Sequence, residues 1–130
     1  MTVGLAATTL ANKWLDMLSG TAFTAPVGAF IKLHTADPGA AGATAAAVGS
    51  AVRVAITYAA AAAGVKSMNG TLPVWTNGGT TETITHISSW DAITAGTFLW
   101  DAVLTAAQAW ASTNTFTLTS LSLTMTPIAA

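Results

Sequence analysis

The chain has 130 residues and no cysteine, and charged residues make up only 7% of it, against about 25% in ordinary soluble domains. This length fits one domain, which we assign to residues 1–130, and a chain of this size can bury one proper core. The lack of cysteine excludes disulfides and thiolate metal sites. The net charge of −1 and the four scattered basic residues exclude the clustered phosphate contacts that nucleic-acid binding requires.

So few charges leave a surface of Thr, Ser, Ala and Gly, which protects a free monomer poorly against association. A subunit that sits against other subunits has less need of charge, so the composition favours an assembly component. No stretch reaches the roughly 18 consecutive apolar residues of a membrane span. The N-terminus also lacks the basic start of a signal peptide. We therefore expect a protein made in the cytoplasm and left unprocessed, with no membrane partner.

The first segment predicts an α-helix over about residues 5–19. Its apolar side chains recur at helical spacing, at Ala7, Leu10, Ala11, Trp14 and Leu18. The following Ser19-Gly20 gives a stop signal, because glycine suits the left-handed position at a helix C-terminus. The helix either closes one end of the domain or docks on a neighbouring subunit. In the second case Trp14 and Leu18 are the expected contact residues.

After Pro26 the hydrophobic period changes to two, and Val27–Thr35 predicts a strand. The strand ends at Asp37-Pro38-Gly39, a turn in which proline fixes φ and glycine accepts a positive φ. Residues 36–50 are rich in Ala and Gly, a composition that does not form a core strand. We expect a flexible surface loop there, with Asp37, Pro38 and Gly39 available for contacts between subunits.

The rest of the chain predicts short strands between turn signals. Asn69-Gly70 and Asn77-Gly78 are typical of hairpin turns, whereas residues 59–64 favour neither strand nor loop. Strands are expected over residues 52–58, 81–90, 97–104 and 114–126. With the N-terminal helix, about seven short strands indicate a mainly β fold, an antiparallel β-sandwich or small barrel.

Two of these strands carry apolar residues at both parities. Phe116 and Leu118 share one parity, and Leu121 and Leu123 take the other. A strand of period two cannot bury both sets on one face, so we predict a β-bulge or bend near Ser120. A similar break separates Ile84 and Trp90 from Ile87.

Hydrolytic and metal chemistry are both weakly supported. His86, Ser88 and Asp91 lie along one strand, whereas a catalytic triad needs side chains that converge from different elements. His34 and Asp37, joined by His86 or Asp91, could hold a metal, but no spacing requires it and Asp37 has a sufficient role in its turn. We therefore expect no catalytic residue, no metal and no cofactor.

The tryptophans admit two interpretations. Trp75, Trp90, Trp100 and Trp110 could form a platform for a sugar, with carboxylates from Glu82, Asp91 and Asp101. Tryptophans at strand positions are more often core residues or anchors at subunit contacts. We expect exposed tryptophans at an assembly interface, to which we assign Trp75, Trp100 and Trp110.

Four segments carry a resemblance to a known family. They are LANKWLDML, KLHTADPGAAG, VWTNGGTTETITHISSWDA and AGTFLWDAVLTAAQAW, and the most specific pieces are Leu33–Gly39 and Thr85–Trp90. Together they resemble short proteins encoded among the virion genes of actinobacteriophages and related prophages. Such proteins are variously labelled capsid decoration, minor tail or tail fibre proteins. The resemblance implies a structural component of a tailed-phage virion and no enzyme.

Within this family we favour a capsid decoration protein, because the chain is compact and lacks the coiled-coil heptads or repeats of a fibre shaft. Its expected partners are the major capsid protein and copies of itself. The expected assembly is a homo-oligomer, and a trimer is one form that it could take. Its expected location is the capsid surface. The alternative is a minor tail or tail-fibre module that contacts the host surface, where a glycan would be the partner.

Overall fold

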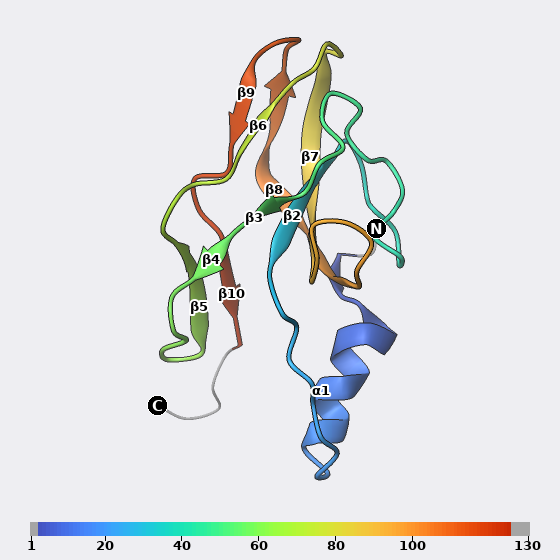
Figure 1. The fold of residues 1–130 in the computed structure, drawn as a ribbon, viewed down its shortest axis with the longest axis vertical. Helices are drawn as coiled ribbons and strands as arrows, with labels where there is room; N and C mark the ends of the chain where they lie inside the picture. Colours follow the sequence, from blue (N-terminus) through green and yellow to red (C-terminus); the bar gives the residue numbers. More distant parts are fainter. Residues whose placement is uncertain (1–2, 126–130) are drawn as a thin grey trace.

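The computed structural model describes residues 3–125 and confirms a mainly β fold with antiparallel sheets and one helical segment near the N-terminus (Figure 1). The described residues form ten strands instead of about seven, because several are only two or three residues long. They are β1 (Gly4–Leu5), β2 (Phe30–His34), β3 (Val54–Ala55), β4 (Thr57–Tyr58), β5 (Val65–Asn69), β6 (Val74–Thr76), β7 (Glu82–Trp90), β8 (Phe98–Trp110), β9 (Thr115–Thr117) and β10 (Ser122–Thr124).

The described strands form two layers. One layer is a five-stranded sheet in the order β1-β8-β7-β2-β3. The other consists of a three-stranded sheet, β10-β5-β4, and a two-stranded sheet, β6-β9. All of these pairs are antiparallel. The layers cover each other's apolar faces, as the two sheets of a sandwich do.

The helical segment is a π-helical turn, η1 (Ala7–Ala11), which continues as α1 (Asn12–Met17). Leu10 is its one buried residue and packs into the core, while Trp14 is half-buried. Leu15, Met17 and Leu18 are exposed, so the apolar side of α1 points largely away from the domain. No helix among residues 3–125 is long and apolar enough to cross a membrane.

The strand expected over residues 52–58 is divided between the two layers. β3 pairs with β2 in the five-stranded sheet, and β4 pairs with β5 in the opposite layer. Between them Ile56 is buried, and its N–H donates to the Ala29 carbonyl at 2.9 Å. The chain therefore changes sheets at Ile56, which the alternating pattern of this segment could not reveal.

Both predicted strand irregularities are present. The β7–β8 ladder changes register between Ile84 and His86, so that both Ile84 and Ile87 are buried. The expected strand 114–126 is interrupted between β9 and β10, around Ser120, and its last residue lies outside the described part. This interruption lets Phe116 and Leu118 enter the core while Leu121 and Leu123 pack against its margin.

The expected hairpins at the two Asn-Gly pairs are wrong. β6 follows Asn69-Gly70 and precedes Asn77-Gly78, but it pairs with β9, about 40 residues further along the chain. Asn69 is the last residue of β5, Gly70 follows it with a positive φ of 77°, and Asn77-Gly78 directly follows β6. The first connection joins β5 to β6, which belong to two sheets of the same layer, and the second carries the chain from β6 to β7 in the other layer. Neither closes a two-residue turn between paired strands.

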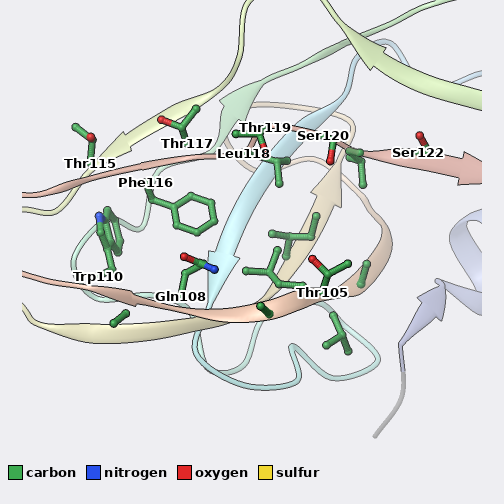
Figure 2. Close-up of a pocket in the computed structure, with 17 residues that line it drawn as sticks. Thr105, Gln108, Trp110, Thr115, Phe116, Thr117, Leu118, Thr119, Ser120 and Ser122 are labelled. Carbon is green, nitrogen blue, oxygen red and sulfur yellow. The ribbon is translucent and has the colours of Figure 1, made fainter.

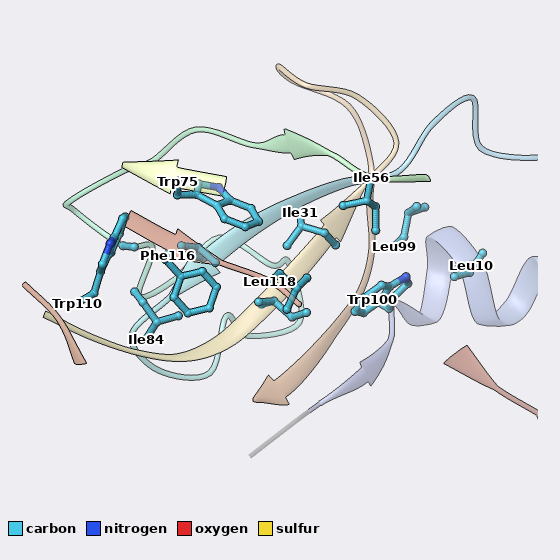
Figure 3. Close-up of a cluster of buried hydrophobic side chains, with 13 residues drawn as sticks. Leu10, Ile31, Ile56, Trp75, Ile84, Leu99, Trp100, Trp110, Phe116 and Leu118 are labelled. Atoms are coloured by element: carbon cyan, nitrogen blue, oxygen red, sulfur yellow. The ribbon is translucent and has the colours of Figure 1, made fainter. Parts of the chain in front are cut away.

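The core lies between the two layers and includes three of the tryptophans (Figure 3). Trp75 and Trp110 are 1% and 2% exposed, and both rings meet Phe116 edge-on, at centroid distances of 5.9 and 6.4 Å. Trp100 is also buried. Edge-to-face pairs of this kind add to the free energy that burial of the rings supplies.

The loop 36–50 is irregular, as expected, and is hydrogen-bonded along β2. Thr35 N–H donates to the Ala45 carbonyl at 2.9 Å, and Ala47 N–H donates to the Leu33 carbonyl at 3.0 Å. The Glu82 carboxylate accepts hydrogen bonds from the N–H groups of Val48 and Gly49, at 3.1 and 2.8 Å. These contacts hold the second half of the loop, residues 45–49, and the flexibility of the loop stays a prediction.

Replacement of Glu82 tests how firmly the loop is held. Glu82→Ala removes both acceptors, and we expect a loss of about 1–2 kcal/mol of unfolding free energy together with faster proteolysis within residues 36–50. Glu82→Gln keeps one acceptor oxygen, so its stability and its rate of proteolysis should lie between those of the wild type and of Glu82→Ala. Limited proteolysis and urea denaturation measure these effects. Equal proteolysis of all three proteins would show that Glu82 does not restrain the loop.

Candidate functional site

The two most specific sequence motifs fold against each other on the side of the five-stranded sheet that carries the loop 36–50. β2 and β7 pair antiparallel with His34 opposite His86 and Lys32 opposite Ser88. β8 adds Asp101 opposite Ser88. Residues opposite each other across a sheet share a face. We call the resulting group the polar cluster, and it consists of His34, His86, Ser88, Trp90 and Asp101.

His34 lies at the centre of a directional chain of hydrogen bonds. Its Nδ1 is 2.8 Å from the carbonyl oxygen of Thr44, so Nδ1 carries the proton. Its Nε2, 2.7 Å from Ser88 Oγ, therefore accepts the hydroxyl proton. Ser88 Oγ accepts in turn from Trp90 Nε1–H at 2.8 Å. This arrangement is that of the neutral imidazole, and it links the loop to two strands of the sheet.

Ser88 and His34 form the contact that a serine nucleophile and its base would make, but neither can reach a substrate. Both residues are fully buried. The hydrogen bond from Trp90 also occupies the serine oxygen. Asp91, the expected third member, accepts from Thr97 N–H at 2.6 Å in a separate turn. The geometry favours a structural role for this pair.

His86 and Asp101 each retain a polar atom without a hydrogen-bond partner in the described residues: Nε2 of His86 and Oδ2 of Asp101. Thr85 Oγ1 lies 2.7 Å from the other nitrogen of His86, and Gly4 N–H donates to the other oxygen of Asp101 at 2.7 Å. Residues 3–125 contain no group of three or more His, Cys, Asp or Glu side chains that could hold a metal ion.

Burial shifts two pKa values in the polar cluster in opposite senses. Burial lowers the pKa of His34 below its ordinary 6.5, and the positive charges of Lys32 and His86 lower it further, against the effect of the hydrogen bond to Thr44. Burial raises the pKa of Asp101 above its ordinary 3.8, and the nearby Asp37 adds to this, against the effect of the hydrogen bond from Gly4.

The lowered pKa of His34 predicts a fall in stability on mild acidification. Because His34 binds a proton more weakly when folded, the unfolded chain takes up more protons below about pH 6.5, and the unfolding free energy decreases. Asp101 has the opposite sign, since its raised pKa adds stability as the pH falls towards 3.8. Urea denaturation at pH 7.5 and 5.5 should therefore show a loss that His34→Gln reduces and Asp101→Asn leaves in place. An unchanged pH dependence in His34→Gln would contradict this assignment.

The residues predicted to make assembly contacts lie in three different settings. Leu18 is 80% exposed and Trp14 is half-buried, so the end of α1 is accessible. In the turn Asp37-Pro38-Gly39, Pro38 is fully buried and Gly39 N–H donates to Asp37 Oδ1 at 2.8 Å, with a φ of 72° at Gly39. Their part in assembly remains a prediction.

The expected exposure of Trp75, Trp100 and Trp110 is wrong. All three lie in the core, and two of them donate their indole N–H inward, Trp75 to the Val52 carbonyl and Trp110 to the Asn114 carbonyl. Buried rings offer no face for stacking on a sugar. Trp90 is half-buried, and the guanidinium of Arg53 lies 3.7 Å from its ring centroid.

Sequence reasoning missed the pairing of His34 with Ser88, because it combined Ser88 with His86. These two residues are neighbours along one strand, whereas His34 comes from β2, 54 residues earlier. The available signal was that both residues lie in the two most specific motifs. Only the register of β2 against β7 brings them together.

The fold defines a small antiparallel β domain in which His34, Ser88 and Trp90 of the polar cluster form hydrogen bonds with one another. Residues 5–126 match the family model described as Podophage GP4 fiber I protein gp80. The match covers nearly the whole chain, and the protein therefore belongs to this family of phage fibre proteins. No curated protein matches the chain.

Proposed function

We propose that this protein is a structural subunit of a phage fibre, which works by contact with neighbouring subunits and does not catalyse a reaction. The observation that carries the proposal is the family match over residues 5–126. The buried polar cluster supports it, because the serine and histidines that could act chemically are enclosed. Copies of the same chain and other virion proteins are the proposed partners, and the tail is the proposed location.

The exposed apolar residues support a role in assembly. Leu15 on α1, Leu18 directly after it and Val27 in the following segment are 65%, 80% and 96% exposed. Single exposed apolar side chains are ordinary, but several near one end of a domain with so few charges indicate a surface that another protein covers. Contact with the host surface, including a glycan, would have to use residues other than the buried tryptophans.

Attachment to the capsid shell is the second candidate. The observation that favours it is the compact domain, whose described helix ends at Met17 and which has no fibre-shaft repeat. In that case the major capsid protein is the partner and the chain cements neighbouring shell subunits. The family description favours the fibre.

Location and copy number on the particle separate the two candidates. Cryo-electron microscopy of intact virions, with quantitative mass spectrometry of the purified particle, should find a few copies at the tail. Many copies spread over the shell would contradict the fibre proposal and support a capsid decoration protein. Absence from purified virions would contradict both.

Leu18 provides a test of the α1 surface. Leu18→Ser leaves the monomer nearly as stable as wild type, because the side chain is 80% exposed. We expect at least a several-fold lower amount of the protein in virions that carry this variant. The matched control is Ile93→Ser, another exposed apolar residue, in the connection between β7 and β8. Equal incorporation of both variants would exclude the end of α1 from the assembly contact.

A further inference from the structure

An open groove of about 620 Å³ runs along one side of the sandwich, between β8 and the segment 115–122 (Figure 2). Its floor is apolar and comes from both layers, with Ile87 and Leu104 on one side and Leu118 on the other. Figure 2 shows Phe116 and Leu118 directed from the β9 segment towards β8. The groove is therefore the place where the two layers remain unclosed at their edge.

The strands on both sides of this groove have unpaired edges within the described residues. β1 covers β8 only at Trp100 and Asp101, beyond which no described strand pairs with its outer edge. β9 pairs only with β6, which does not line the groove. No described backbone hydrogen bond joins β8 to β9, although the two strands follow each other in the chain. Each edge thus presents free N–H and C=O groups.

Neither edge carries a charge or a proline, although β8 is irregular over residues 104–107, where its pairing with β7 changes register. Proteins normally place charges or proline on an exposed edge. None of the 17 residues that line the groove is charged or a proline. Residues 105–109 of β8 are exposed one after another, on both faces of the strand. The opposite edge of the five-stranded sheet differs, because Arg53 directly precedes β3 there.

We infer that this side of the sandwich is an interface between two copies of the chain, related by a two-fold axis. In antiparallel pairing about such an axis, β8 meets β8 of the second copy. The residues close to the axis then face the same residues of the second copy. A charged side chain near the axis would be repelled by the same side chain of the second copy. The residues that line the groove include no charged side chain. The absence of charge suits a second copy better than a different partner, which could use complementary charges.

The pairing would convert the groove into part of a shared core. The five-stranded sheets would join through their β8 strands, and the apolar floor would be covered from both sides. A stable interface of standard size buries about 800 Å² on each partner, which is the area that the joined edges have to supply. This interface deepens the proposed assembly function and rests on it. It gives a dimer, so the expected trimer would need a second surface.

The test is the mass of the full chain in solution. Analytical ultracentrifugation should find a dimer, and Ala106→Lys should weaken it at least tenfold, because it places like charges together where β8 meets β8. Thr117→Lys should also weaken it, because it puts a charge into the groove that the dimer would cover. Both positions are exposed, so the monomer should still fold. Ala61→Lys, an exposed position remote from the groove, is the matched control and should leave the dimer intact.

Cysteine crosslinking gives an independent readout, since the chain has no cysteine of its own. Single variants at Val103, Ala106 and Ala109 sample the β8 edge, and at least one should form a disulfide-linked dimer under mild oxidation, while Ala61→Cys should not. A monomer at every concentration up to the solubility limit would overturn the inference. So would an oligomer whose mass the lysine variants leave unchanged. In the latter case the chain would assemble through another surface, and the proposed function would still hold.

Discussion

Trp75→Ala should lower the unfolding free energy by about 3–5 kcal/mol, one of the largest effects expected from a single substitution in this chain. The ring is 1% exposed, meets Phe116 edge-on at 5.9 Å and donates its indole N–H to the Val52 carbonyl. Its removal leaves a cavity where the layers meet and an unpaired carbonyl. Because small domains are stable by only about 5–15 kcal/mol, the variant should unfold at much lower urea concentration.

Trp14→Ala is the matched control for this prediction. Trp14 is half-buried on α1 and only packs against the margin of the core, so its loss should cost about 1 kcal/mol. Urea denaturation followed by circular dichroism measures both variants. Similar small effects at Trp14 and Trp75 would mean that Trp75 is an exposed contact residue after all, and that β6 does not cover the core as described.

The tryptophans show where prediction from the sequence stops. Alternation along a strand states which residues share a face, but it does not state which face another layer covers. β6 has Trp75 buried between exposed Val74 and Thr76, and it is covered because it pairs with β9, a partner about 40 residues away. No local signal indicates that pairing. The class of fold could be predicted, because strand periods and turn signals are local.

The strand breaks were predictable for the same reason. A change of apolar parity within one segment, as from Ile84 to Ile87, requires an irregularity wherever the strand goes. The contacts of the polar cluster were not predictable, since His34 meets Ser88 only through the register of β2 against β7. β8 also runs on to Trp110 through residues 105–109, whose alanines favour strands poorly, because β7 pairs with its far end.

The Asn77 side chain joins its own connection, between β6 and β7, to the end of β8, although its sequence context predicted only a tight turn. It is 2% exposed, and its amide donates to the carbonyl oxygens of Thr80 and Trp110 at 2.7 and 3.0 Å. Its Oδ1 accepts from the N–H groups of Gly79 and Thr80, at 2.9 and 3.0 Å. All of its hydrogen-bonding capacity is therefore used, as a buried polar group requires.

Asn77→Asp should destabilise the protein by about 3–5 kcal/mol at neutral pH, although the side chain keeps its shape. A carboxylate retains the two bonds accepted at Oδ1, but it faces the Thr80 and Trp110 carbonyl oxygens without a proton to donate. A buried charge then lies against two carbonyl dipoles, and both carbonyls lose a partner. Protonation restores one donor, so the loss relative to wild type should shrink as the pH falls.

The sign of that pH dependence separates electrostatic repulsion from lost packing. Asn77→Ala loses the same donors without gaining a charge, so its deficit relative to wild type should stay constant as the pH falls. Urea denaturation of the two variants between pH 7.5 and pH 5 makes the comparison. Equal pH dependence in both would show that the introduced carboxylate is hydrated, and that the connection around Gly78 opens readily to water. In that case the Asn77 side chain would not be what holds the connection after β6 against the end of β8.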